Sequence, residues 1–233
     1  MSNISNWIDV HARFSPDKLA VIDHQKEYTY ADLADAIGTN ARMLKHSLRV
    51  GRGDRVAYLG LNGVEFISLM FGCARLGAIF VPLNWRLETP EYHYILTDAS
   101  PKALIVTPDF KHQVDTLDDA HPDCLFVLQD SHWAGLDTHT LNPNWHSYSA
   151  LQQSCDTNTS DYNAHVDLNA PVLIVYTSGT TGHPKGAVLD QKALFYNALN
   201  SQHMHDMSKT DTILTVLPMF HVGGLNIQTL PAL

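Results

Sequence analysis

Basic residues are scarce in this sequence. Its 233 residues include 15 Lys and Arg against 24 Asp and Glu, a formal net charge of −9 with neutral histidines. A protein that binds the nucleic acid backbone needs clustered positive charge to displace counterions from the phosphates. The composition therefore argues against nucleic acid as a partner.

Cysteine pairs and long apolar runs are also lacking. Cys73, Cys124 and Cys155 lie far apart and form neither a CxxC pair nor the disulfide framework of a secreted domain. The first residues lack the basic flank and unbroken apolar stretch of a secretory signal. The longest apolar passage, Phe66 to Leu83, is interrupted by Arg75 and Gly77, so we interpret it as the end of a buried helix followed by a buried strand. These absences predict a soluble, cytoplasmic protein that is not transmembrane.

Apolar side chains make up 45% of the sequence, enough for a sizeable core. Short apolar segments alternate with segments of helical periodicity, a rhythm typical of an α/β fold with parallel sheets and helices on both faces. The helix after Thr29 begins with the spacing of a capping box to Asp32. The predicted strands are Leu19 to Asp23, a segment ending at Tyr28 and Thr29, Arg55 to Gly60, Ala78 to Leu83 and Lys102 to Val106; the other helices are Val64 to Leu76, ended by Gly77, and Pro90 to Asp98.

Beyond Leu128 the character of the sequence changes, since the stretch from Ser131 to Ala170 is polar. We predict a first α/β subdomain over residues 1–130, a polar connection over 131–170 and the start of a second α/β subdomain over 171–233. The elements predicted after Val106 are a helix from Asp109 to Ala120, a strand from Leu125 to Leu128, a short helix near Tyr148 to Gln153, a strand from Val172 to Tyr176, a short strand from Ala187 to Leu189, a helix from Gln191 to about Met207 with Asp190 as N-cap, and a strand from Thr212 to Leu217.

The segment from Tyr176 to Gly186 joins an apolar strand to a run rich in glycine and hydroxyl residues that ends in Pro184 and Lys185. Glycines let backbone N–H groups approach anionic oxygens, hydroxyls add neutral donors, and a lysine adds one mobile positive charge. The order of residues differs from a Walker A loop, because a proline precedes the lysine and a glycine follows it. The pattern predicts a polyphosphate-binding loop; the alternative is a polar turn between two strands.

The sequence YTSGTTGHPKG closely resembles the phosphate-binding signature of the adenylate-forming superfamily, which includes the acyl-CoA synthetases. The region from Gly53 to Val106 resembles the N-terminal region of acyl-CoA synthetases, and LPMFHVGG, from Leu217 to Gly224, resembles the next family motif. The resemblance implies that the chain is an incomplete large N-terminal domain of an adenylate-forming enzyme, and that the small C-terminal domain is absent.

This resemblance implies an ATP-dependent acid–CoA ligase that forms an acyl-adenylate and then a thioester. ATP, Mg²⁺ and CoA are the implied cofactors and co-substrates, and the other substrate is a small-molecule carboxylic acid that the sequence does not identify; the segment MFHVGGLNIQ is compatible with fatty or aromatic acids. Catalysis of this kind depends on positioning and on neutralising charge. The resemblance implies that the β- and γ-phosphates of ATP are bound by the loop residues Thr177, Ser178, Gly179, Thr180, Thr181, Gly182 and Lys185.

His221, in the PMFH segment, is implied by the resemblance to border the acyl pocket and the route of the thiol, which makes it the candidate catalytic residue. The alternative is a histidine packed and hydrogen-bonded at a strand end. Gly223 and Gly224 either allow close approach of substrate or form the turn into the next helix. The histidines of HMHDM, His203 to Met207, point apart on a helix, and we predict no metal site in this chain.

The family motifs expected farther along a complete enzyme do not occur in these residues. We therefore expect an N-terminal fragment that is inactive alone, with an apolar surface and an unpaired sheet edge near Leu233 that could support homo-oligomers. Two other functions stay open: a non-catalytic phosphate-binding or protein-interaction module, and an adenylation domain that loads a carrier protein.

Overall fold

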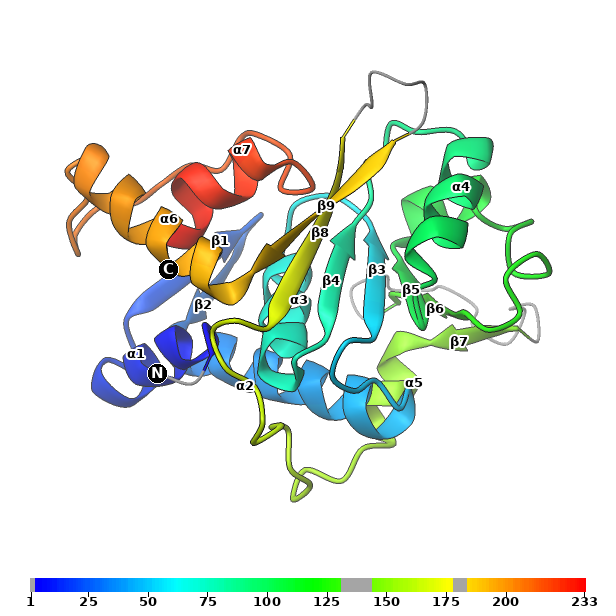
Figure 1. Ribbon diagram of the computed structural model, residues 1–233. Helices are drawn as coiled ribbons and strands as arrows, with labels where there is room; N and C mark the ends of the chain where they lie inside the picture. The colour runs from blue at the N-terminus through cyan, green and yellow to red at the C-terminus, as the bar shows by residue number, and fades with distance from the viewer. Residues whose placement is uncertain (1–2, 131–143, 178–183) are drawn as a thin grey trace.

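A seven-stranded sheet forms the centre of the molecule (Figure 1). The computed structural model describes residues 3–130, 144–177 and 184–233. The sheet order is β7-β6-β5-β3-β4-β8-β9; six strands run parallel, and β9 is antiparallel to β8. The strands are β3 Arg55–Leu59, β4 Ile79–Pro82, β5 Ala103–Val106, β6 Leu125–Leu128, β7 Trp145–Ser147, β8 Pro171–Thr177 and β9 Lys185–Asp190.

Helices cover both faces of this sheet, which confirms the predicted fold class. On one face α2 (Tyr30–Arg42), which continues as a π-helical turn Met43–Ser47, and α3 (Val64–Leu76) pack on a core that includes Val56, Tyr58 and Phe80. On the other face α4 (Thr89–Ala99) packs on the neighbouring strand residues Ala57, Leu59 and Val81. Successive side chains of a strand point to opposite faces, so each apolar strand contributes to both cores.

Local sequence signals set the ends of two of these helices. Thr29 caps α2, because its hydroxyl accepts from the Asp32 N–H and the Asp32 carboxylate accepts from the Thr29 N–H. Gly77 ends α3 at a φ of +71°, in the left-handed region that favours glycine. Both features are as the sequence predicts.

The N-terminal elements lie outside the main sheet. Strands β1 (Leu19–Asp23) and β2 (Lys26–Thr29) pair antiparallel as a separate two-stranded sheet. Helix α1 (Asn6–Phe14), which we do not predict from the sequence, precedes them and contacts α2. Its buried residue Ile8 joins the same core as α2 and α3.

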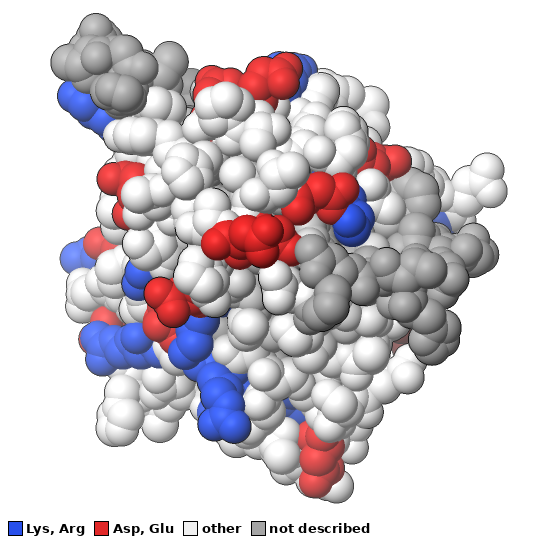
Figure 2. Space-filling view, turned by 90° about the vertical axis from the view of Figure 1, so that its right-hand side faces the viewer, with Lys and Arg blue, Asp and Glu red and all other residues white. Residues whose placement is uncertain are grey.

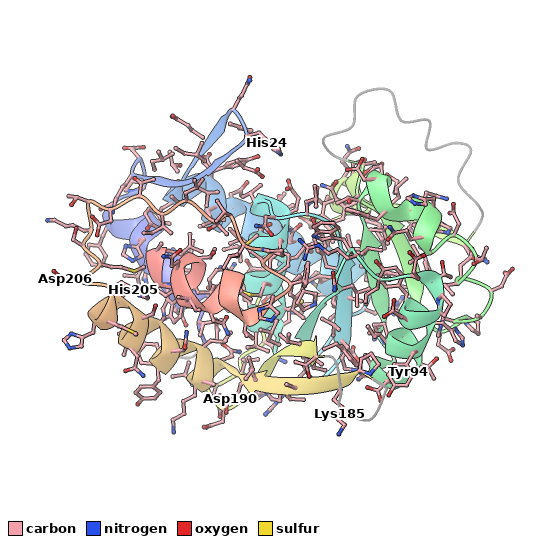
Figure 3. The ribbon with its side chains drawn as sticks, turned by 90° about the horizontal axis from the view of Figure 1, so that it is seen from above. His24, Tyr94, Lys185, Asp190, His205 and Asp206 are labelled. Carbon is pink, nitrogen blue, oxygen red and sulfur yellow. The ribbon has the colours of Figure 1, made fainter. Side chains whose placement is uncertain are left out.

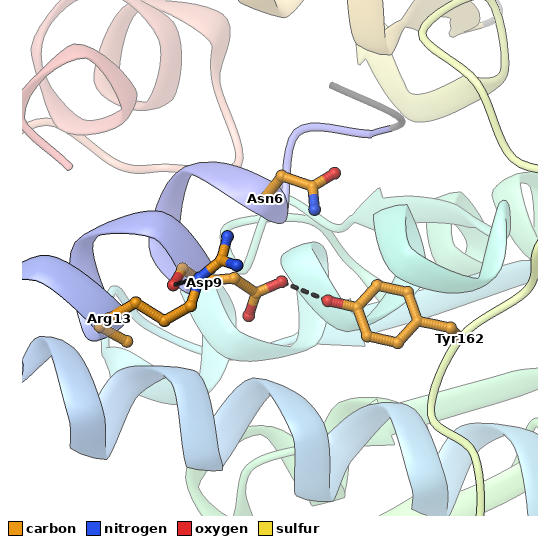
Figure 4. A pocket seen from close by; sticks show the side chains of 5 residues that line it. Asn6, Asp9, Arg13 and Tyr162 are labelled. Carbon is orange, nitrogen blue, oxygen red and sulfur yellow. Dashed lines mark hydrogen bonds between the residues drawn. The ribbon is translucent and has the colours of Figure 1, made fainter.

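The polar connection is anchored to the body of the molecule through Arg75 of α3. The guanidinium, 4% exposed, bonds the carboxylates of Asp9 at 2.7 Å and of Asp161 at 2.6 Å. Tyr162 lies under this guanidinium and donates its hydroxyl hydrogen to Asp9 (Figure 4). Paired charges are needed here because an isolated buried guanidinium would be costly. The connection also contains α5 (Tyr148–Gln153), at the predicted place.

Part of the predicted secondary structure needs correction. Between Asp109 and Ala120 there is no α-helix: a 3₁₀ helix, Pro108–Gln113, is followed by turns whose N–H groups bond three residues back. The apolar spacing is real, since Val114 and Leu117 are buried, but tight turns bury them equally well. Strand β7 is not predicted from the sequence, because it lies within a largely polar stretch; Trp145, its first residue, is buried against Phe126.

The segment from Thr212 to Leu217 is not a strand. Its large apolar side chains are exposed, 79% for Leu214 and 73% for Val216, and no described strand lies beside it to complete a ladder. The preceding helix, α6 (Gln191–Met204), begins at the predicted N-cap Asp190. It ends before Met207, because Asp206 adopts a φ of +51°.

The remaining C-terminal elements are short: α7 (Val222–Gly224), a π-helical turn Leu225–Thr229 and α8 (Leu230–Ala232). Since β8 and β9 continue the sheet of the first 130 residues, strands from both predicted subdomains share one sheet. The boundary at residues 131–170 stays a prediction. Exposed apolar side chains gather near the end of the chain, as expected; they include Leu214, Val216, Leu217, Val222 and Ile227.

Surface charge is mixed on the face of the molecule that lies to the right in Figure 1. Figure 2 shows Lys and Arg interrupted there by Asp and Glu among mostly uncharged residues. In the described ranges, no helix combines the length and apolar character needed to cross a bilayer.

Candidate functional site

The two described ends of the predicted phosphate loop face each other across a strand pair. Thr177 is the last residue of β8 and Lys185 the first of β9, and the two are register partners. The Thr177 hydroxyl lies 3.5 Å from the Lys185 carbonyl oxygen. Ser178, Gly179, Thr180, Thr181 and Gly182, which we predict to bind phosphate, lie outside the described residues.

Lys185 extends away from the sheet at its rim (Figure 3). Its side chain is exposed, and within the described ranges it forms no ion pair. A lysine ammonium without a carboxylate partner can bind an anionic oxygen without first breaking an ion pair.

Tyr176 ties the end of β8 to α4. Its hydroxyl donates to the Asp98 carboxylate at 2.6 Å, and burial, followed by this bond to Asp98, raises the pKa of the phenol. Its register partner is Gly186, where an added Cβ would lie 2.8 Å from Ile174 Cγ2 and 3.2 Å from Tyr176 Cζ. The glycine therefore leaves room for the tyrosine ring, and the loop has a fixed base.

The PMFH segment contacts the chain just after β4. Phe220 contacts Trp85 edge to face, with ring centroids 6.4 Å apart. Trp85 follows β4, whose direction is that of β8, so the residues after both strands leave the same edge of the sheet. In open α/β sheets, ligands bind outside the carboxyl ends of the strands. The described structure thus brings His221 and the loop base to one edge.

His221 is exposed and forms the N-cap of α7. Its Nδ1 accepts a hydrogen bond from the Gly223 N–H at 3.2 Å. The ring lies at a helix start and is exposed, whereas the alternative placed a packed, hydrogen-bonded histidine at a strand end; its hydrogen bond agrees with that alternative, and the catalytic role stays a prediction. Gly224 lies in a tight turn, where an added Cβ would be only 2.3 Å from the Pro218 carbonyl oxygen. This close approach favours the interpretation that Gly224 forms the turn into the next helix.

Two hollows lie on the described surface. One, of about 430 Å³, is lined by Asn6, Asp9, Ala12, Arg13 and Tyr162 and contains none of the predicted site residues (Figure 4). The other, of about 260 Å³, lies by Asn62 and Thr107, after β3 and β5 at the carboxyl edge of the sheet. Neither volume defines the predicted phosphate site, whose loop lies outside the described residues.

Two features of the site are not predicted from the sequence. Asn62 follows β3 and bonds the backbone of Leu217 and Met219. Tyr176, although part of the motif, receives no role there, and its partner Asp98 comes from α4. The sequence shows only that Asn62 is an amide residue shortly after an apolar strand. Its two hydrogen-bond partners lie 155 and 157 residues away, and no local pattern predicts that pairing.

The AMP-binding enzyme family matches residues 8–233. The chain belongs to this family. Its fold agrees with that assignment: the N-terminal domain of FACL13 from Mycobacterium tuberculosis superposes with a TM-score of 0.79 at 29% identity, covering 100% of this chain and 55% of that one. The predicted resemblance to adenylate-forming enzymes is confirmed.

Named relatives of this AMP-binding chain are acid–thiol ligases. An indoleacetate–CoA ligase of Aromatoleum aromaticum is 46% identical over 231 residues, which are 99% of this chain and 43% of the relative. The fatty acid–[acyl-carrier-protein] ligase ScoC of Streptomyces coeruleorubidus is 34% identical over 219 residues, 92% of this chain and 39% of the relative. The chain thus spans less than half the length of either relative.

Proposed function

We propose that this chain supplies the phosphate-binding part of an ATP-dependent carboxylic acid–CoA ligase. The observation that carries the proposal is the register pair of Thr177 and Lys185, which brackets the glycine-rich motif at the carboxyl edge of the sheet. ATP supplies the phosphorus that the acid attacks and the pyrophosphate that leaves. Thr177, Ser178, Gly179, Thr180, Thr181, Gly182 and Lys185 orient the β- and γ-phosphates by hydrogen bonds and one positive charge.

The residues at the loop base fit a polyphosphate. An exposed ammonium and an exposed hydroxyl flank the loop, and Tyr176 fixes the strand that carries them. For Mg²⁺ the fit is different: the part of the chain that the structure describes holds no cluster of three or more His, Cys, Asp or Glu suited to a metal ion. We therefore assign Mg²⁺ to no described side chain.

For the acid we propose an aryl or arylalkanoic carboxylate. Support comes from the relative that is 46% identical and carries the name indoleacetate–CoA ligase. The acceptor is CoA in this proposal. A carrier protein is the second candidate, because a relative of 34% identity is named an acyl-carrier-protein ligase. His221 lies at the same sheet edge as the loop base, and we assign it to the acyl side of the site.

Binding of Mg·ATP to the 233-residue chain tests the proposal. Lys185→Gln removes the positive charge and keeps a polar side chain of similar length, so we expect the dissociation constant to rise about tenfold or more. Lys192→Gln is the matched control, since Lys192 is also exposed but lies on α6. Isothermal titration calorimetry measures the dissociation constants of both variants and of the unchanged chain. Equal affinity of Lys185→Gln and the unchanged chain would contradict the phosphate role of Lys185.

A further inference from the structure

Asn62 holds the backbone of the PMFH segment at two points. Its Nδ2 donates to the Leu217 carbonyl oxygen at 2.9 Å, and its Oδ1 accepts from the Met219 N–H at 2.8 Å. Only an amide side chain carries both a donor and an acceptor in this arrangement. These bonds give Leu217 and Met219 side-chain partners where no neighbouring strand is described.

The position of His221 follows from this clamp. Met219, at the end of the clamped stretch, is buried in the main core, and the His221 N–H bonds the Pro218 carbonyl oxygen at 3.2 Å. Phe220 packs against Trp85. The chain from Leu217 to His221 is thus fixed by the Asn62 amide on one side and by an aromatic contact on the other.

The hydrogen bond to His221 Nδ1 decides where its proton lies. Because Nδ1 accepts from the Gly223 N–H, the neutral imidazole carries its hydrogen on Nε2. The ring is exposed, so this N–H is available to a ligand. An N–H donor of this kind can bind a carboxylate or phosphoryl oxygen. In this tautomer Nε2 already carries a hydrogen, so it does not act as the base that abstracts a proton.

We infer that Asn62 is a positioning residue for His221: its two bonds to Leu217 and Met219 hold His221 as an outward Nε2–H donor for an oxygen of the acid substrate. The assignment of that oxygen to the acid rests on the proposed function. The clamp and the tautomer concern this chain's own residues alone, and they can be tested without any ligand.

The test uses the whole 233-residue chain with Asn62→Ala and Asn62→Asp. Long-range proton–nitrogen spectra identify the His221 tautomer, and hydrogen exchange reports the Met219 N–H. In the unchanged chain we expect the Nε2–H tautomer and a protected Met219 amide. In Asn62→Ala we expect signals averaged over both tautomers and exchange about tenfold faster. Asn62→Asp keeps the acceptor but loses the donor, so its effect on exchange should be smaller, with the tautomer signals still shifted.

The matched control is Asn197→Ala. Asn197 also donates to a backbone carbonyl of the C-terminal residues, that of Asn226, but from α6. It should leave the His221 spectrum unchanged, and a change equal to that of Asn62→Ala would overturn the inference. A folded Asn62→Ala with the tautomer and exchange of the unchanged chain would also overturn it; if that variant does not fold, the same result in Asn62→Asp decides.

A titration with indole-3-acetate and Mg·ATP separates this inference from the proposed function. We expect the His221 signals to shift when the acid and nucleotide bind. If they do not shift while the Asn62 variants still change the tautomer, the acid-ligase proposal fails and the clamp stands.

Discussion

The central parallel strands and the C-terminal region differ in how they use apolar side chains. Every residue of β4 and β5 is buried, and both of their faces are covered. In β9, by contrast, no residue is buried, and the chain after α6 exposes Leu214 and Val216. The comparison teaches that apolar composition alone does not make a core: a strand must also have a sheet neighbour and a layer on each face.

Replacing Phe80 in β4 should give the largest effect. Phe80 is fully buried, and its ring lies 5.0 Å from the Phe66 ring and 6.0 Å from the Tyr58 ring. Phe80→Ala leaves a cavity, so we expect the free energy of unfolding to fall by about 3–5 kcal/mol. Val188→Ala in β9, where the side chain is 58% exposed, should change it by less than about 0.5 kcal/mol. Urea unfolding measures both; similar losses would break the comparison between the two regions.

Gly224→Ala should give an intermediate effect within the C-terminal region. The new methyl would lie 2.3 Å from the Pro218 carbonyl oxygen and 2.7 Å from that of Leu217, so we expect a loss of about 1–3 kcal/mol. Gly223→Ala is the control, because its methyl would meet only the His221 ring, with Nδ1 at 3.4 Å. Thermal unfolding of the two variants measures the difference. If both behave alike, this turn is no more tightly packed than the exposed segment before it.

Acidic pH should give the smallest effect, at the surface of the first region. His93 on α4 and His121 share a hydrogen bond of 3.0 Å between ring nitrogens, and burial, followed by the charge of His93, lowers the pKa of His121. Because the pKa of His121 is lowered in the folded protein, its contribution to the free energy of unfolding is fully present above about pH 6.5, the ordinary pKa. This contribution is lost as the pH falls through the pKa of His121 in the folded protein. Unfolding free energy should therefore decrease below pH 6.5. The decrease should flatten in His121→Gln; an unchanged slope there would show that other groups cause it.

Much of the parallel core can be predicted because its signals are local. Leu125 to Leu128 forms a strand at the predicted bounds, and Val64 to Leu76 forms a helix ended by Gly77. Apolar runs, a capping box and a left-handed glycine act within a few residues of themselves. Where the signal needs a distant partner, prediction fails: Thr212 to Leu217 has the composition of a strand but no described neighbour to pair with.

The candidate site divides in the same way. The order of glycines, hydroxyl residues and Lys185 predicts a phosphate-binding loop and the family; the family is confirmed, and the phosphate role of these residues stays a prediction. Nothing along the chain indicates that Tyr176 bonds Asp98, or that the PMFH segment is held by an amide from the end of β3.

The sequence by itself determined the alternation of strands and helices, the membership of the AMP-binding family and the residue types of the loop, because these depend on neighbours along the chain. Only the tertiary structure decided that β9 runs antiparallel and that Asn62 meets Leu217 and Met219. The physical reason is that hydrogen bonds across a sheet edge depend on which strands become neighbours in space, and that choice is made by the packing of the whole core.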